Sequence, residues 1–176
     1  GIANPFKTAW ELRGMENMLA DFLEDADFVE ALYEKIYAFE TERARRLAQA
    51  GIDILTITGD IAMQTGLLMS PTLWRSFDKP RLARLVREVK HIKPGMHVYF
   101  HSDGNVEAII PDLLEAGVDI LNPVQPECMD PEKIKQRFGG RLTLWGTGSL
   151  QRTLPFGSEA DVRAEVRERI RTCGEN

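Results

Sequence analysis

The sequence predicts an α/β fold in which alternating strands and helices build part of a parallel barrel or sheet. Short runs rich in Ile, Val, Leu and aromatic residues occupy positions 52–58, 96–101, 118–122 and 142–146, and helical patterns separate them. Such runs are typical of buried parallel strands. A polar cluster follows each run. Because the strands of a parallel barrel or sheet all end on one face, these clusters are expected to converge on one site.

Two helical stretches precede the first of these strands. Residues 10–24 are expected to form the first, and residues 25–49 a longer helix with an apolar stripe. The stripe consists of Phe28, Val29, Leu32, Tyr33, Ile36 and Phe39. Gly51 is a candidate left-handed cap between this helix and the strand at 52–58.

The next helices are marked by capping and turn residues. After a long loop, Ser70 and Pro71 predict an N-cap and the first helical position, and Pro80 predicts a break in that helix. Lys-Pro-Gly at 93–95 predicts a turn before the second strand. A helix over 105–116 is expected to close at a glycine.

The C-terminal part contains two further helices with recognisable ends. Asp130-Pro131-Glu132 predicts a short helix that ends at Phe138, before two glycines. Ser158 is expected to cap the last helix, which has acidic residues near its positive end and arginines near its negative end.

A repeated segment supports a fold built from similar units. Residues 50–55 (Ala-Gly-Ile-Asp-Ile-Leu) are echoed by residues 116–121 (Ala-Gly-Val-Asp-Ile-Leu), as if one helix-to-strand joint occurred twice. The predicted order is two helices followed by four β-α units, too few to close an eight-stranded barrel, so a doubly wound sheet is the alternative. No Gly-x-Gly-x-x-Gly follows a strand, so dinucleotide binding has no support.

Composition excludes several functional classes. The net charge of −5 and the lack of a basic patch argue against nucleic acid as the main partner. No apolar run approaches the roughly 18 residues of a membrane span. Cys128 and Cys173 are too few for a disulfide framework, so a reducing cytoplasmic location is expected. The start at Gly1 and the end just past a helix suggest a piece of a longer protein.

His101 and Asp103 are the candidate metal ligands. They lie two residues apart directly after a strand, and alternate residues of an extended segment point the same way. An imidazole and a carboxylate suit zinc or another divalent ion. The alternative is that residues 103–105 form only a turn and a helix cap.

Other polar residues at the strand ends are candidates for catalysis and substrate binding. Asp60 could act as a general base, anchor a substrate cation or cap a turn, and His101 is the second catalytic candidate. Gln64, Asn122 and Gln125 are the predicted substrate-binding residues, because their amides can orient a ligand through hydrogen bonds. For Asn122 and Gln125 the alternative is capping of the backbone in the turn.

Together these residues resemble the uroporphyrinogen decarboxylase superfamily. The likeness runs over nearly the whole chain through 12–16 (Leu-Arg-Gly-Met-Glu), 60–64, 70–71, 101–105, 110–125 and 145–148. The resemblance implies a (β/α)8 TIM barrel with its active site at the carboxyl ends of the strands. It also implies that the chain covers roughly the C-terminal half, with residues 1–176 as part of a single barrel domain.

The superfamily contains two chemistries. Its haem-pathway decarboxylases remove acetate carboxylates from uroporphyrinogen without a cofactor, using an N-terminal Arg-rich segment that this chain lacks. The other branch resembles methylcobamide-dependent methyltransferases, in which His-x-Cys-Gly and a later Cys hold zinc that keeps an acceptor thiol as thiolate. Residues 101–104 (His-Ser-Asp-Gly) match this motif with Asp103 in place of the Cys.

On this basis we expect methyl transfer with a corrinoid rather than uroporphyrinogen decarboxylation; a non-catalytic corrinoid- or tetrapyrrole-binding protein is the third alternative. The expected substrate is a small molecule or a corrinoid protein, and a homodimer is one expected assembly. Zinc is expected to be weakly bound through His101 with Asp103 as an optional partner. The family's later Cys would lie beyond Asn176, and Cys128 is a further group that could approach the site.

Overall fold

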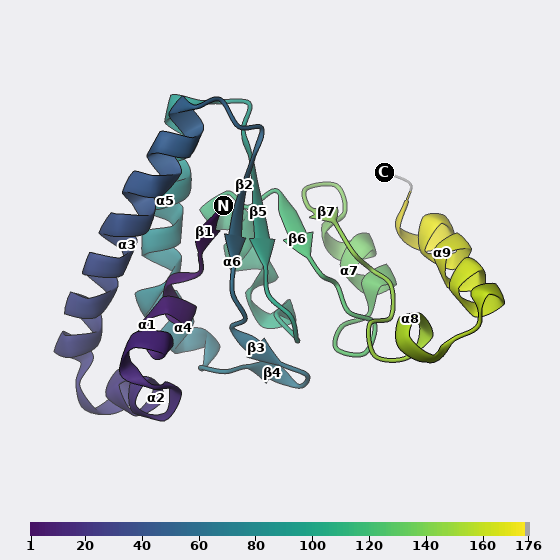
Figure 1. The fold of residues 1–176 in the computed structure, drawn as a ribbon, viewed down its shortest axis with the longest axis horizontal. Coiled ribbons are helices and arrows are strands. Elements are labelled where there is room, and N and C mark those ends of the chain that lie inside the picture. Colours follow the sequence, from purple (N-terminus) through teal and green to yellow (C-terminus); the bar gives the residue numbers. More distant parts are fainter. Residues whose placement is uncertain (175–176) are drawn as a thin grey trace.

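A five-stranded parallel sheet forms the centre of the protein, which we describe from a computed structural model over residues 1–174. Its strand order is β1-β2-β5-β6-β7, and every neighbouring pair is parallel (Figure 1). The strands span Ile2–Ala3, Ile54–Thr58, His97–His101, Ile120–Asn122 and Thr143–Leu144. The four predicted strands are therefore confirmed, and their pairing excludes an antiparallel sheet.

Helices connect the successive strands. They are α1 (Pro5–Arg13), α2 (Met15–Glu24), α3 (Ala26–Gln49), α4 (Pro71–Phe77), α5 (Lys79–Ile92), η1 (Glu107–Ile109), α6 (Ile110–Ala116), α7 (Pro131–Phe138), α8 (Thr153–Phe156) and α9 (Glu159–Cys173). The long helices α3 and α5 pack side by side along one side of the sheet, whereas α9 lies beyond β7 at its other edge (Figure 1). None of the described helices combines the length and apolar character needed to cross a bilayer.

Side chains along the central strands alternate between a buried and a more open face. Leu55 and Ile57 of β2 and Val98 and Phe100 of β5 are at most 1 % exposed and belong to the core shared with the helices. Tyr99, which lies between two of them, is only half-buried. This is the two-residue period of a strand, and it places the sheet's polar side chains on the face away from the helices.

The capping residues act where the sequence predicted them. Ser70 accepts from the backbone N–H of Leu73, and Asp130 accepts from the first turn of α7. Ser158 forms a reciprocal capping box with Asp161 at the start of α9. The predicted break near Pro80 is confirmed, because α4 ends at Phe77 and α5 begins at Lys79.

The repeated joint is also confirmed. Gly51 after α3 and Gly117 after α6 have φ angles of 87° and 94°, a left-handed conformation that glycine adopts without steric cost. The aspartate that follows each glycine pairs with a lysine near the end of α5: Asp53 with Lys93, and Asp119 with Lys90.

The structure corrects several predicted boundaries. The expected helix over 10–24 is two helices, because Gly14 interrupts it with a φ of 88°. The expected helix over 105–116 begins only at 107, as a 3-10 turn, and becomes α-helical at Ile110. Strand β1 was not predicted, and part of the loop expected before Ser70 is a hairpin of β3 (Ala62–Met63) and β4 (Gly66–Leu67).

The buried stripe of α3 also differs from the predicted one. Val29, Tyr33 and Ile36 are buried as expected, whereas Phe39 is 64 % exposed. Tyr37 is buried in its place, because the 3.6-residue period of the helix carries the stripe through positions 29, 33, 36, 37 and 40.

Asp78, between α4 and α5, is a buried acid held by two tyrosines. The hydroxyls of Tyr33 and Tyr37 donate to its two carboxylate oxygens, each at 3.3 Å. Burial raises the pKa of Asp78 from 3.8 to about 7, although these hydrogen bonds and Arg81 act in the opposite direction. Arg81 itself forms ion pairs with Glu30 and Glu34 of α3.

We expect stability to depend on pH through Asp78. The folded state binds the carboxyl proton of Asp78 more tightly than the unfolded state does. The contribution of the protonated Asp78 to the free energy of unfolding is therefore fully present below pH 3.8 and is lost as the pH rises to about 7. The difference between 3.8 and about 7 corresponds to roughly 4 kcal/mol. Asp78→Asn, which stays neutral, should lose this dependence when urea denaturation is compared across that interval.

The matched control for this prediction is Asp53→Asn, which replaces an acid whose side chain is 92 % exposed. Its unfolding free energy should change with pH over the same interval much as it does in the unmodified protein. A slope for Asp78→Asn equal to that of the control would contradict the assignment.

Candidate functional site

The candidate site lies where β2 and β5 end, and the two loops that follow are joined by hydrogen bonds. The N–H of Gly59 donates to the carbonyl of His101 at 3.3 Å. The N–H of Asp103 donates to Asp60 Oδ1 at 2.9 Å, and the N–H of Ile61 donates to Ser102 Oγ at 3.0 Å. Each loop therefore fixes the position of the other.

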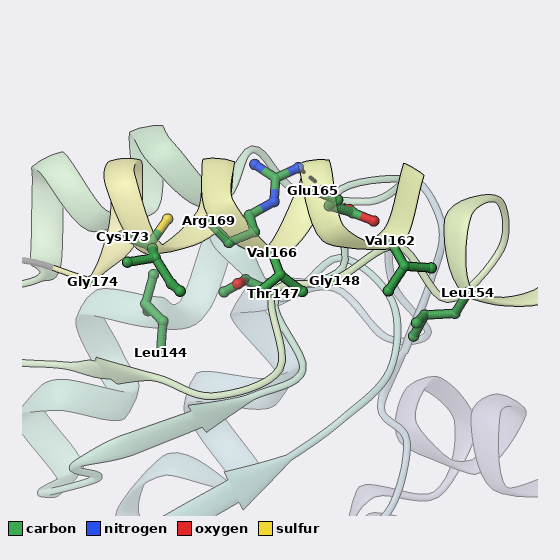
Figure 2. A pocket seen from close by; sticks show the side chains of 11 residues that line it. Leu144, Thr147, Gly148, Leu154, Val162, Glu165, Val166, Arg169, Cys173 and Gly174 are labelled. Atoms are coloured by element: carbon green, nitrogen blue, oxygen red, sulfur yellow. Dashed lines mark ion pairs between the residues drawn. The ribbon is translucent and has the colours of Figure 1, made fainter. Parts of the chain in front are cut away.

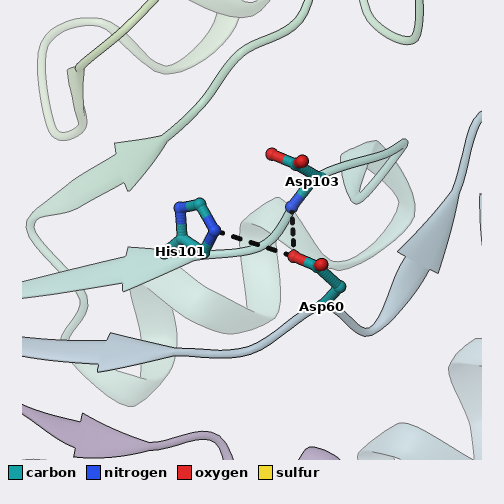
Figure 3. A group of neighbouring side chains, drawn as sticks. All are labelled: Asp60, His101 and Asp103. Atoms are coloured by element: carbon teal, nitrogen blue, oxygen red, sulfur yellow. Dashed lines mark hydrogen bonds and ion pairs between the residues drawn. The ribbon is translucent and has the colours of Figure 1, made fainter.

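Asp60, His101 and Asp103 come together at this junction. One ligand atom from each lies within 4.8 Å of the other two, and His101 Nε2 is 3.7 Å from Asp60 Oδ1 (Figure 3). The side chains of Asp60 and His101 are 52 % and 32 % exposed, so the group is open to solvent. Ser102, between the two predicted ligands, is fully buried and points to the opposite side, as the alternation of an extended chain requires.

His101 is oriented by the neighbouring strand. Its Nδ1 lies 2.7 Å from Oδ1 of Asn122, the residue paired with it in the sheet register. Asn122 in turn donates from Nδ2 to the carbonyl of Trp145 at 2.9 Å. Both polar atoms of the Asn122 side chain are thus engaged by the protein, and its predicted contact with substrate stays a prediction.

Gln125 supports the loop that carries Asp103. Its Oε1 accepts the N–H of Gly104 at 2.7 Å, and the side chain is only 5 % exposed. The thiol of Cys128 donates to the same oxygen at 3.4 Å, so this cysteine does approach the site. Burial raises the pKa of the Cys128 thiol, with nearby acidic charges adding to the effect, which favours the protonated form over a reactive thiolate.

Gln64 lies in the turn between β3 and β4, the hairpin that follows Asp60. Its Nε2 donates at 3.0 Å to Oε1 of Gln151, in the loop after β7. Both side chains are exposed at this contact. The hairpin and the β7 loop are therefore linked, and Gln64 remains the most accessible of the three predicted substrate-binding residues.

The donor set fits a divalent metal ion. The sequence suggested two ligands, His101 and Asp103, which is fewer than the three protein ligands of a typical catalytic zinc site. The structure adds Asp60 as a third candidate. One imidazole nitrogen and two carboxylate groups suit zinc and also harder ions that prefer oxygen ligands.

The sequence did not identify Asp60 as a candidate metal ligand, Ser102 as the acceptor that joins the loops, or the carbonyl of Trp145 as the acceptor for Asn122. Strand alternation could have identified Ser102, whereas the other two depend on contacts between strands that are distant in sequence. His97 is exposed at the opposite end of β5, as expected for a residue outside the site.

A separate apolar cavity lies between α9 and the end of β7 (Figure 2). It has a volume of about 300 Å³ and is lined by Leu144, Val166 and Ile170 among others, with the Arg169–Glu165 ion pair beside them. Cys173 also lines it. None of the predicted site residues does, so this cavity is distinct from the candidate site.

Comparison with known proteins gives two findings. The sequence matches the family described as uroporphyrinogen decarboxylase (URO-D) over residues 1–176. The fold is similar to a solved methyltransferase from Methanosarcina mazei, with a TM-score of 0.76 and 26 % sequence identity. The similarity covers 97 % of this chain and 48 % of the methyltransferase, so this chain spans about half the length of the methyltransferase. No curated protein matches the chain.

Gly104 should be essential to the junction between the two loops. Its φ is 86°, and a Cβ there would meet the backbone of Ala62 and Met63 at 2.7 Å. Gly104→Ala should therefore lower the free energy of unfolding by roughly 1–3 kcal/mol, measured by urea denaturation. Gly95→Ala is the control, because its Cβ would meet nothing within 4 Å. Equal stability of the two variants would show that the junction tolerates a side chain.

Proposed function

The chain belongs to the uroporphyrinogen decarboxylase family, and from this premise we propose that it carries part of the active site of a methyltransferase. The proposed site holds a divalent metal ion, with zinc as the first candidate, through Asp60, His101 and Asp103. A corrinoid, free or bound to a protein, is the proposed methyl donor. The observation that carries the proposal is the three-residue ligand group, and the methyltransferase of similar fold supports it.

The three side chains are placed to hold a cation at the carboxyl ends of the strands. Oδ1 of Asp60 accepts a hydrogen bond from the N–H of Asp103, and this bond fixes the Asp60 carboxylate beside His101. His101 presents Nε2 to the same space because its Nδ1 faces Asn122. A bound divalent ion would supply Lewis acidity there and stabilise the deprotonated form of an acceptor group.

Cofactor-free decarboxylation of uroporphyrinogen is the second candidate function, since the family includes it. A decarboxylase of that kind needs no ligand pair at His101 and Asp103. Two carboxylates close together also repel an acidic substrate unless a cation lies between them. A protein that binds a corrinoid or tetrapyrrole without catalysis is the third candidate, supported by Asp103 at the position where the related motif has Cys.

One assay separates these functions. The full-length protein is incubated with methylcobalamin plus a thiol, and in parallel with uroporphyrinogen. We expect demethylated cobalamin and a methyl thioether in the first reaction and no coproporphyrinogen in the second. Product from uroporphyrinogen alone would replace the proposal with decarboxylation, whereas no product in either reaction would favour a binding protein.

Metal content gives an independent prediction. Because Asp60 adds a third candidate ligand to the two from which the sequence predicted weak binding, elemental analysis of the full-length protein should find zinc or another divalent ion near stoichiometry. His101→Ala should abolish methyl transfer, and Asp103→Asn or Asp60→Asn should reduce activity and metal content in parallel. Because losing even an outer-shell partner typically costs about 10–100-fold in affinity, the loss of a ligand should cost no less.

His97→Ala is the matched control for the metal prediction. It removes an exposed histidine from the opposite end of the same strand, paired with Ile54 rather than with the site. Its metal content should equal that of the unmodified protein. A protein that contains no divalent ion, or that loses it equally in both histidine variants, would remove the metal site, leaving His101 as an acid–base or substrate-binding residue.

A further inference from the structure

Three hydrogen-bonding groups in a row determine which nitrogen of His101 carries its proton. The row runs from the backbone carbonyl of Trp145 to the side chain of Asn122 and then to the imidazole of His101. These groups follow or end the adjacent strands β7, β6 and β5, so they extend across three neighbouring strand ends.

The carbonyl of Trp145 fixes the orientation of the Asn122 amide. A carbonyl oxygen can only accept a hydrogen bond, so the amide group at 2.9 Å from it must be the NH2 donor. The amide oxygen Oδ1 therefore faces His101 at 2.7 Å. Because Oδ1 also only accepts, Nδ1 of His101 must carry a hydrogen, and in the neutral ring Nε2 is left with a free lone pair.

The anchor itself is rigid. The N–H of Trp145 donates to the carbonyl of Leu121 at 2.9 Å, and the carbonyl of Gly146 accepts from Val124 at 3.1 Å. The indole ring of Trp145 contacts Tyr99 edge to face, with ring centroids 5.5 Å apart. The carbonyl that orients Asn122 is thus held by backbone contacts on both sides and by one ring contact.

Gly146 gives Asn122 the space it needs. Its φ is 76°, and a Cβ at this position would lie 2.9 Å from Nδ2 of Asn122. The Trp-Gly pair at 145–146 therefore supplies both the acceptor for the amide and the room beside it.

We propose that Asn122 is a positioning residue that holds His101 in the Nδ1–H tautomer, so that Nε2 is the atom presented to a metal between Asp60 and Asp103. The metal part of this inference rests on the proposed function. The tautomer follows from the hydrogen-bonding groups alone. Asn122 thereby acts through His101, as outer-shell partners of metal-binding histidines commonly do.

The tautomer is tested on the metal-free protein by 15N NMR of its imidazoles, at a pH well above the usual histidine range. The His101 signals are assigned by comparison with His101→Ala. We expect a protonated Nδ1 and an unprotonated Nε2. Asn122→Leu should give a mixture of tautomers, whereas Asn122→Asp, which keeps an acceptor towards His101, should restore the single form. A wild-type ring protonated at Nε2 would overturn the proposal.

A second readout is the affinity for Zn²⁺, measured by chelator competition. The Zn²⁺ affinity of Asn122→Leu should be about 10–100-fold lower than that of the wild type, and that of Asn122→Asp should fall less. Gly146→Ala should also lower the Zn²⁺ affinity, because the new methyl group displaces the amide of Asn122. Asn122 itself is still present in this variant. Unchanged affinity and an unchanged tautomer in Asn122→Leu would overturn the positioning role.

Asn105→Leu is the matched control. Asn105 also joins two loop segments, through a bond from Nδ2 to the carbonyl of Cys128 and one from the N–H of Glu107 to Oδ1. Neither of these bonds involves His101, so the His101 tautomer and the Zn²⁺ affinity of Asn105→Leu should match those of the wild type. Changes equal to those of Asn122→Leu would mean that general loss of loop order is the cause.

The same data separate this inference from the proposed function. An unchanged tautomer, Zn²⁺ affinity and rate of methyl transfer in Asn122→Leu would overturn the positioning role and leave the function intact. A wild-type protein that binds neither Zn²⁺ nor another divalent ion would overturn the metal site of the proposed function and the metal part of the inference, while the NMR spectrum would still decide the tautomer.

Discussion

The candidate site depends on the parallel pairing of β2 with β5. Their register places Thr58 opposite His101, so the two strands end at the same level and the loops that follow start side by side. The backbone bond from Gly59 to His101 extends this pairing by one step. Asp60 and Ser102 then each accept an N–H from the opposite loop, which brings residues about forty positions apart into one group.

The polar atoms at the strand ends divide into two kinds. Both polar atoms of Asn122 and Oε1 of Gln125 are used inside the protein, where they hold His101 and the 103–105 loop in place. Those of Asp60 and Gln64 are more exposed and remain accessible to a ligand. The more exposed polar side chains face solvent, and the less exposed ones orient the site. This arrangement is expected of a preorganised site, because few side chains then need to reorder when a ligand binds.

Concentrating Asp60 and Asp103 beside one imidazole has an electrostatic cost. Two negative charges at short range repel each other, and only one backbone N–H in the loop pair, that of Asp103, partly compensates Asp60. A divalent cation between them would turn the repulsion into attraction. The same charges make the site a poor match for a substrate rich in carboxylates, which supports our proposal of methyl transfer over uroporphyrinogen decarboxylation.

The sequence by itself determined the parts of this protein that depend on neighbours along the chain. These are the strands, the helix caps at Ser70 and Ser158, the repeated glycine joints and the shared direction of His101 and Asp103, since side-chain period and capping chemistry act over a few residues. Strand β1 and the β3–β4 hairpin were not predicted, because a two-residue strand carries too little periodic signal unless, as for β7, it lies within a longer apolar run. The third candidate ligand, Asp60, and the contacts of Asn122 were decided only by the tertiary structure, because the register between strands depends on the packing of the whole sheet and is not encoded in any local pattern.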